Sequence, residues 1–345
     1  MSSRRQSLTP RQLVILTRVV DAYISSGHPV GSKALVEAGA VDASPSTVRS
    51  ELAELEARGF LNHPHTSAGR VPTDAGYRLY AEGLLDQPLG GPDLPVDLSK
   101  VRRELDVALR VTTEMLSQVT SLVALVTAPP LESTEIRHVE VLVLQPQVVM
   151  VVVITSTGGV TKKIFPFQRP VDPKLAEWAN AFLNEQLTGV RLGGRTLVHR
   201  LEEPGLSPTE RAFLDRLRPA FTELVDAGEQ QLYVGGGARL VEEMRFADLA
   251  EINDLVRVLE GRVGLLEMLR QALDSPRPYL RIGADHSVPY MRGLAMVAAN
   301  YGLATRNLGT VSLIGPRRMD YAVAIRSVRG AAHALSEFVA EVYEE

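Results

Sequence analysis

Three closely spaced helix signals near the N-terminus restrict the fold more than any other feature of this chain. Thr9-Pro10-Arg11-Gln12 combines an N-cap residue, a proline at the first helical position and a capping-box glutamine, and helical periodicity then continues to Gly27. A short second helix is predicted from Ser32 to Glu37, and Ser44-Pro45 opens a third that reaches Gly59. The four-residue turn between the last two helices, residues 40–43, is typical of a helix-turn-helix.

A polar hairpin is predicted directly after this motif. Residues 60–63 favour a strand, residues 64–71 are polar and carry an arginine, and Pro72-Thr73 leads into a further helix. A helix-turn-helix followed by such a hairpin indicates a winged helix. Residues 87–95 hold three prolines and two glycines, so we expect a linker there.

The rest of the chain alternates between helical and strand segments. A long amphipathic helix is predicted from Asp97 to about Val126, and residues 138–167 favour an antiparallel meander. Residues 170–275 are mostly helical in pattern, with the short apolar piece Leu232–Val234 among the helices. Strand character then resumes at residues 279–282, 294–301 and 310–314, before a closing helix from about Arg318 to Val342.

Strands separated by a hundred mostly helical residues predict one α+β domain that carries an insertion. The expected fold class is therefore multidomain α+β. Its expected parts are a winged-helix domain at residues 1–85, a linker at 86–97, an α+β domain at 98–169 and 276–345, and an inserted, mostly helical domain at 170–275.

The third helix presents two chemically different faces. Val48, Leu52 and Leu55 share one face and are expected to form its core side. The opposite face carries short hydroxyls and an arginine near the helix N-terminus, the end that enters the major groove in a helix-turn-helix. For an isolated helix an ordinary solvated face is the alternative, but the hairpin that follows favours DNA. The expected DNA-contacting residues of this helix are Ser44, Ser46, Thr47, Arg49 and Ser50.

A second set of residues is expected to contact the DNA backbone or the minor groove. A hairpin tip with small polar residues and an arginine suits such contacts, although an exposed loop without a function is the alternative. Residues 1–80 carry a net charge of +2 and the remainder −6, which has the sign expected of an N-terminal module that approaches a polyanion. The expected wing and backbone contacts are Lys33, His65, Thr66, Ser67 and Arg70.

Several strings of residues carry a resemblance to a known family. Three are N-terminal: residues 29–33 (PVGSK), 44–49 (SPSTVR) and above all 64–73 (PHTSAGRVPT). Two lie further along the chain, at residues 232–236 (LYVGG) and 313–321 (LIGPRRMDY). By these strings the chain resembles the HrcA family of heat-inducible transcription repressors, and the likeness covers most of the length.

The resemblance implies a dimeric repressor with a winged helix, a GAF-like domain and a dimerisation domain inserted in it. It also implies an inverted-repeat operator of the CIRCE type before chaperone operons, release on heat stress, and the GroEL chaperonin as a modulator. Two positions depart from the family strings: Ser50 follows the arginine of the third helix where asparagine is usual, and Arg317 stands where threonine is usual.

Two other classes of function require features of their own. A ligand-sensing regulator, in which the GAF-like domain binds a small effector, needs a pocket with convergent polar groups, and the apolar strands show no such cluster. An enzyme is disfavoured because no nucleophile–base pair or cofactor loop is present; residues 235–237 (GGG) predict a tight turn rather than a phosphate loop.

Neither a cofactor nor a metal is expected. The chain has no cysteine, and its seven histidines do not fall at metal-ligand spacings. The apolar run from Val148 to Ile154 is too short for a membrane span, and no signal peptide is recognisable, so a cytoplasmic protein, nucleoid-associated when bound to its operator, is expected.

Overall fold

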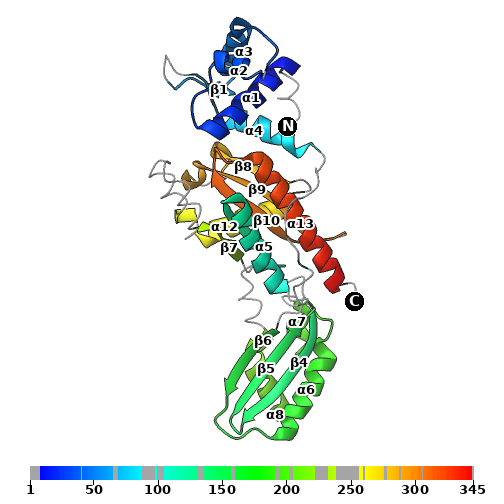
Figure 1. The fold of residues 1–345 in the computed structure, drawn as a ribbon. Helices are drawn as coiled ribbons and strands as arrows, with labels where there is room; N and C mark the ends of the chain where they lie inside the picture. The colour runs from blue at the N-terminus through cyan, green and yellow to red at the C-terminus, as the bar shows by residue number, and fades with distance from the viewer. Residues whose placement is uncertain are drawn as a thin grey trace.

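The computed structural model shows an elongated molecule with three lobes in a row (Figure 1). The N-terminal module forms one end, a central domain lies in the middle, and an inserted domain forms the other end. The described residues are 8–39, 41–64, 69–87, 98, 105–129, 135–156, 160–191, 195–201, 205–221, 232–237, 256–258, 261–275, 278–286, 289–304 and 306–343.

The N-terminal module has the order of elements expected of a winged helix, and its helices begin where the sequence places their caps. Thr9 makes the capping box with Gln12, and Gly27 ends the first helix with a φ of 72°. The module comprises α1 (Pro10–Ser26), α2 (Ser32–Glu37), α3 (Pro45–Ala57), β1 (Leu61–Asn62), β2 (Val71–Pro72) and α4 (Asp74–Leu85).

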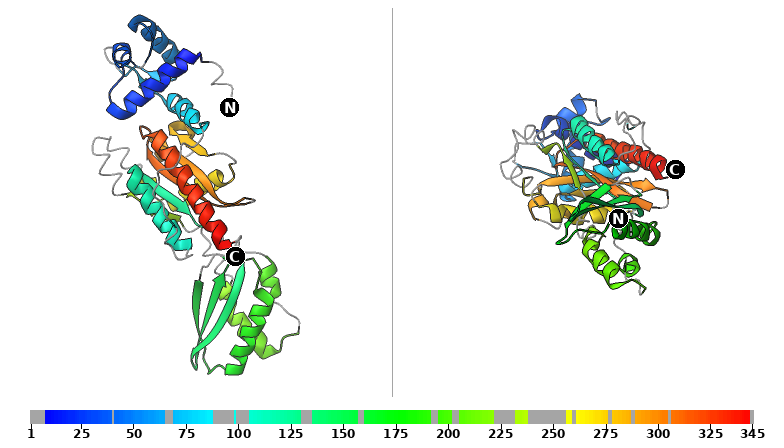
Figure 2. Two further views of the ribbon diagram at one scale, coloured as in Figure 1. Left: turned by 45° about the vertical axis from the view of Figure 1, so that its right-hand side comes forward. Right: turned by 90° about the horizontal axis from the view of Figure 1, so that it is seen from below.

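The central domain is built on a five-stranded antiparallel sheet of order β7-β3-β10-β9-β8. Helices α5 and α13 cover one face of this sheet and α12 covers the other, as the view from below shows (Figure 2). The closing helix α13 buries Ile325, Val328, Leu335 and Phe338. The elements are α5 (Leu105–Thr120), β3 (Val123–Thr127), β7 (Leu232–Gly235), α12 (Arg262–Leu273), β8 (Tyr279–Ile282), β9 (Leu294–Leu303), β10 (Arg306–Pro316) and α13 (Tyr321–Tyr343).

The prediction of one helix as far as Val126 was wrong. Helix α5 ends at Thr120, Ser121 turns the chain with a φ of 55°, and residues 123–127 form strand β3. All five residues of β3 are buried, between β10 and β7. A short, fully buried apolar run has the same composition in a helix and in a central strand, so periodicity could not separate the two.

The inserted domain has its own sheet of order β4-β5-β6 and its own core. The predicted meander is confirmed, since β4 pairs with β5 and β5 with β6, both antiparallel. The elements are β4 (Ile136–Gln145), β5 (Val148–Thr155), β6 (Val160–Pro166), α6 (Pro173–Leu187), α7 (Arg195–Arg200) and α8 (Pro208–Leu217).

This arrangement corrects the expected boundaries of the insertion. The meander packs on α6, α7 and α8 in one buried cluster, so β4, β5 and β6 lie with the insertion and not with the domain assigned to 98–169. At the other end, β7 was expected among the inserted helices but pairs with β3 in the central sheet. The insertion is therefore mixed α+β rather than mostly helical.

Side-chain amides of α6 fix the meander in place. Asn184 Oδ1 accepts from the backbone N–H of Val139 at 2.9 Å, and Asn180 Oδ1 accepts from that of Val141 at 3.0 Å. These bonds satisfy backbone donors of edge strand β4 that the sheet leaves free. No sequence pattern marked the two asparagines.

Helix α4 joins the N-terminal module to the central domain (Figure 1). Its Tyr77 and Tyr80 rings pack against Tyr321, with ring centroids 5.7 and 6.4 Å apart, and the buried residues of both lobes form one continuous cluster. The Tyr80 hydroxyl also donates to Asp21 of α1 at 2.6 Å. The expected linker begins at the end of α4, but residues 88–97 lie outside the described residues.

Candidate nucleic-acid interface

A serine cap sets the start of α3. The Ser44 hydroxyl accepts from the Thr47 N–H at 3.2 Å, and Pro45 occupies the first helical position. The same hydroxyl lies 2.8 Å from that of Ser46 and 2.9 Å from that of Thr47. Three short hydroxyl side chains therefore gather at the N-terminus of the helix.

The faces of α3 are those predicted. Val48, Leu52 and Leu55 are buried. Ser44, Ser46, Arg49 and Ser50 are exposed, and Thr47 is half-buried. Within the described part of the chain, Arg49 has no hydrogen bond or ion pair, so its guanidinium remains available to an anionic or guanine partner.

Helix α1 holds α3 against the rest of the module. Gln12 is buried, and its Nε2 donates to Glu51 on α3 at 3.0 Å while its Oε1 accepts from the Thr9 N–H at 3.1 Å. The capping-box residue of one helix thus also fixes the position of the other. This contact lies behind the exposed face and leaves that face open.

The base of the hairpin is closely packed. Val30 and Arg70 exchange two backbone hydrogen bonds of 2.8 Å, next to the pairing of β1 with β2. The backbone of Val30 lies so near Gly69 that a side chain there would collide with it. The expected contacts His65, Thr66 and Ser67 lie outside the described residues.

The structure pairs Arg70 with a residue of α3. Arg70 Nη2 lies 2.8 Å from Oε2 of Glu56, and the arginine side chain is 19% exposed. The sequence predicted a wing cation facing DNA, whereas the guanidinium lies inward between the hairpin base and α3. Glu56 was not among the predicted residues, because nothing in its local sequence marks a partner in the hairpin.

Lys33 lies on α2 and is largely exposed, with Nζ 3.6 Å from Oε1 of Glu37. An exposed pair of this kind is weak and exchanges readily with other partners. Lys33 therefore remains accessible to phosphate.

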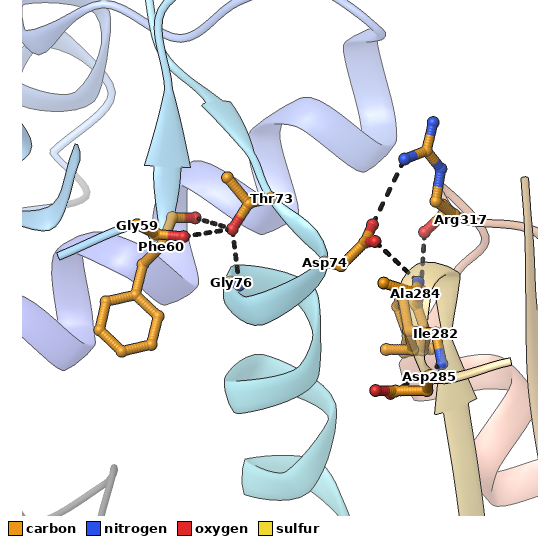
Figure 3. A network of polar contacts seen from close by, with 10 residues as sticks. Gly59, Phe60, Thr73, Asp74, Gly76, Ile282, Ala284, Asp285 and Arg317 are labelled. Carbon is orange, nitrogen blue, oxygen red and sulfur yellow. Dashed lines mark hydrogen bonds and ion pairs between the residues drawn. The ribbon is translucent and has the colours of Figure 1, made fainter. Parts of the chain in front are cut away.

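Sequence reasoning missed the polar contacts that connect α4 to the central domain. Asp74 and Arg78 lie on the first two turns of α4. Asp74 contacts Arg317 (Figure 3), and Arg78 forms an ion pair with Asp285. The one available signal was Arg317, which departs from the usual threonine of the family string. The other residues look like ordinary surface charges in the sequence.

No group of three or more His, Cys, Asp or Glu side chains with the geometry of a metal site occurs among the described residues. Within the same residues, no helix is both long and apolar enough to cross a membrane.

Comparisons with known proteins agree over nearly the whole chain. A family model described as the HrcA protein C-terminal domain matches residues 106–325. The chain is 34% identical over 337 residues to the heat-inducible transcription repressor HrcA of Parafrankia sp. (strain EAN1pec), covering 96% of this chain and 99% of that protein. It is 35% identical over 338 residues to the repressor of the same name from Frankia casuarinae, with the same coverage.

The fold also matches a solved structure. A crystal structure described as that of a hypothetical protein superposes with a TM-score of 0.68 and 23% sequence identity, covering 97% of this chain and 100% of that chain. The arrangement of the lobes is therefore shared with a protein of distant sequence.

Proposed function

The chain belongs to the HrcA family of heat-inducible transcription repressors, and from this premise we propose that it binds an inverted-repeat operator of the CIRCE type before chaperone operons as a homodimer. As a member of that family it is a transcription repressor and not an enzyme. We propose the operator, the dimer and the DNA contacts from the geometry of the protein.

The observation that carries the proposal is the exposed N-terminal half of α3. It carries Ser44, Ser46, Arg49 and Ser50, all exposed, and Arg49 has no partner among the described residues. Helix α3 lies at the end of the molecule farthest from the inserted domain (Figure 1). In the major groove, an arginine pairs bidentately with guanine, and serine and threonine contact base edges or phosphates. Ser46, Thr47, Arg49 and Ser50 are therefore the proposed base-reading residues, and Ser44 keeps the helix start in place.

The hairpin and α2 supply the proposed backbone contacts. Lys33 is exposed and weakly paired, which suits a phosphate contact that carries no sequence information. His65, Thr66 and Ser67 remain proposed wing contacts from their place in the family string. For Arg70, the Glu56 ion pair favours a role in holding the hairpin base against α3 over a direct phosphate contact.

The proposed dimer contact is the outer face of the β4-β5-β6 sheet. Along β5 the side chains alternate, with Val149, Val151 and Val153 buried against the helices and the intervening residues half-exposed. On the outer face, Met150 lies between Leu142 and Ile164, which are 38% and 56% exposed. An apolar sheet face of this kind is typical of a protein interface.

The charges on that face favour a second copy of the chain as the partner. The row next to Met150 places Val152 between Glu140 and Lys162. A two-fold axis along β5 places β4 of one protomer over β6 of its partner. Glu140 of each protomer then faces the partner's Lys162, which gives two symmetric pairs of opposite charge. This self-complementarity is what a two-fold interface requires.

A dimer formed at one end of an elongated protomer leaves the DNA-reading modules free at the other end. Two such modules related by a two-fold axis read two half-sites in an inverted repeat. We expect release on heat stress to follow loss of the competent dimer. The GroEL chaperonin is the proposed modulator, and nucleoid association is expected only while the operator is bound.

The test measures binding of the whole protein to three duplexes at one salt concentration: the inverted repeat, a single half-site and a scrambled repeat. Avidity predicts that the repeat binds about a hundredfold or more tightly than the half-site. Equal affinity for the repeat and the scrambled duplex would contradict the proposal. In parallel, Glu140→Lys should weaken the dimer, and the double variant Glu140→Lys, Lys162→Glu should restore it, as sedimentation measures.

A further inference from the structure

The first turn of α4 makes directional polar contacts with the central domain. The Asp74 carboxylate accepts from the Ala284 N–H at 3.0 Å and from Arg317 Nη1 at 3.3 Å (Figure 3). One turn further along α4, Arg78 forms an ion pair with Asp285. Ala284 and Asp285 belong to one short turn, the 3₁₀ segment η5 (Gly283–Asp285), so two charged residues of α4 meet the same turn.

The η5 turn is shaped to receive Asp74. Gly283 has a φ of +55°, in the left-handed region that side chains disfavour, and a Cβ there would collide with the Asp74 carboxylate. Glycine therefore allows the close approach of the two segments. The fit depends on the backbone of the turn as well as on the charges.

The same end of α4 is bonded to the DNA-reading module. The hydroxyl of Thr73, the N-cap residue, donates to the carbonyls of Gly59 at 2.6 Å and Phe60 at 3.1 Å and accepts from the Gly76 N–H (Figure 3). Gly59 and Phe60 lie two and three residues beyond the end of α3. Because Thr73 and Asp74 are adjacent, the chain after the recognition helix is one residue away from the contact with the central domain.

The far end of α4 is also held. Arg329 Nη1 on α13 lies 3.3 Å from the carbonyl oxygen of Gln87 and 3.5 Å from that of Leu85, at the C-terminal end of α4. Apolar packing of Tyr77 on Tyr321 brings the lobes together but is non-directional. Charge-assisted hydrogen bonds at both ends have preferred directions, so they determine the angle.

We propose that Asp74 and Arg78 are positioning residues for DNA binding: through the η5 turn and Arg317 they fix the angle of the N-terminal module on the central domain. In a dimer, this angle determines the separation and facing of the two recognition helices. The part of the proposal that concerns DNA rests on the proposed function, whereas the part that concerns the angle stands without it.

Electron paramagnetic resonance measures the distance between two spin labels in the full-length protein, and this distance reports the angle. The chain has no cysteine, so Ala57→Cys on α3 and Arg326→Cys on α13, both exposed positions, take spin labels without a background. Labelled protein is diluted with unlabelled protein so that only distances within one chain contribute. The labelled parent should give one narrow distance distribution.

Two different changes should broaden that distribution. Asp74→Ala with Arg78→Ala removes the contacts from α4, and Gly283→Ala displaces the Asp74 carboxylate from the opposite side. Glu82→Ala is the matched control, because it removes a carboxylate from the same helix two turns beyond Asp74. Circular dichroism of each variant confirms that both lobes stay folded, and a narrow, unshifted distribution in both test variants would overturn the proposal.

The second readout is discrimination between operators with different half-site separations. The parent and Glu82→Ala should prefer the natural separation over one lengthened by half a helical turn, by about tenfold or more. The Asp74→Ala, Arg78→Ala variant should lose most of this preference. If the parent binds no operator, the proposed function fails while the distance result still stands; if the parent discriminates and the variant discriminates equally, the positioning role is refuted.

Discussion

Arg70 in the hairpin base and Glu56 on the recognition helix form an ion pair of 2.8 Å, with 19% and 33% of their side chains exposed. The pair joins two parts of the module that are separated by β1 and the hairpin. It therefore connects the position of the wing to the position of α3.

Glu56→Ala distinguishes two roles for Arg70 by the sign of its effect on DNA binding. If Arg70 holds the hairpin base, we expect binding to operator and scrambled duplex to weaken alike, by roughly 1 kcal/mol, because the wing contacts carry little sequence information. If Arg70 contacted phosphate directly, loss of the glutamate would free a cation and strengthen binding. Titration of both duplexes decides, and Glu82→Ala, which removes a carboxylate from α4, is the control for removing a negative charge.

Arg49→Ala should act on the operator alone. Loss of a bidentate guanine contact is expected to cost about 1–3 kcal/mol per half-site and to relax preference at one operator position. The measurement is a titration against operator variants with single base changes, across a salt series. Arg58→Ala is the matched control, because it removes another guanidinium, at the C-terminal end of α3. There Arg58 Nε donates to Glu54 Oε1 at 2.8 Å. An equal effect of both substitutions would contradict a base-reading role for Arg49.

Ser44 should stabilise α3 through its cap. Ser44→Ala removes the acceptor for the Thr47 N–H, and we expect the free energy of unfolding to fall by about 1 kcal/mol. Ser44→Gly should cost only a few tenths of that, because glycine tolerates the cap position. Denaturant unfolding of both variants and of the parent gives the comparison, and an unchanged free energy of unfolding in Ser44→Ala would contradict the capping role.

His286 should make the protein sensitive to mild acid. Burial, assisted by the neighbouring Arg281 cation, lowers the pKa of His286 to about 4, while Asp74 acts in the opposite direction. An unfolded histidine titrates near 6.5, so between about pH 6.5 and 4 the unfolded state binds a proton that the folded state does not. The free energy of unfolding should therefore fall as the pH drops through this window, by about 1.4 kcal/mol per pH unit.

His286→Leu replaces the titrating imidazole by an apolar side chain at the same buried position. Unfolding free energies of the parent and this variant at several pH values isolate the contribution of the histidine from that of the carboxylates. Through this pH window the free energy of unfolding should fall less steeply with decreasing pH in the variant than in the parent. Parallel profiles would contradict the assignment.

The amino-acid sequence by itself determined the features that depend on neighbouring residues. The caps at Thr9 and Ser44 lie where the pattern predicts them, because each is a bond between a side chain and a backbone group three residues away. The buried and exposed faces of α3 follow from its periodicity for the same reason. The family resemblance also needed only the order of residues.

Tertiary structure alone decided what depends on residues far apart in the chain. Residues 123–127 are a strand because β10 and β7 lie on either side of them, and the meander belongs to the insertion because its apolar face meets α6 and α8. Arg70 lies against Glu56, and Asp74 against Ala284 and Arg317, for a similar reason. A charge in a sequence has the same local pattern whether it faces water or a partner two hundred residues away, and only folding brings the partner to it.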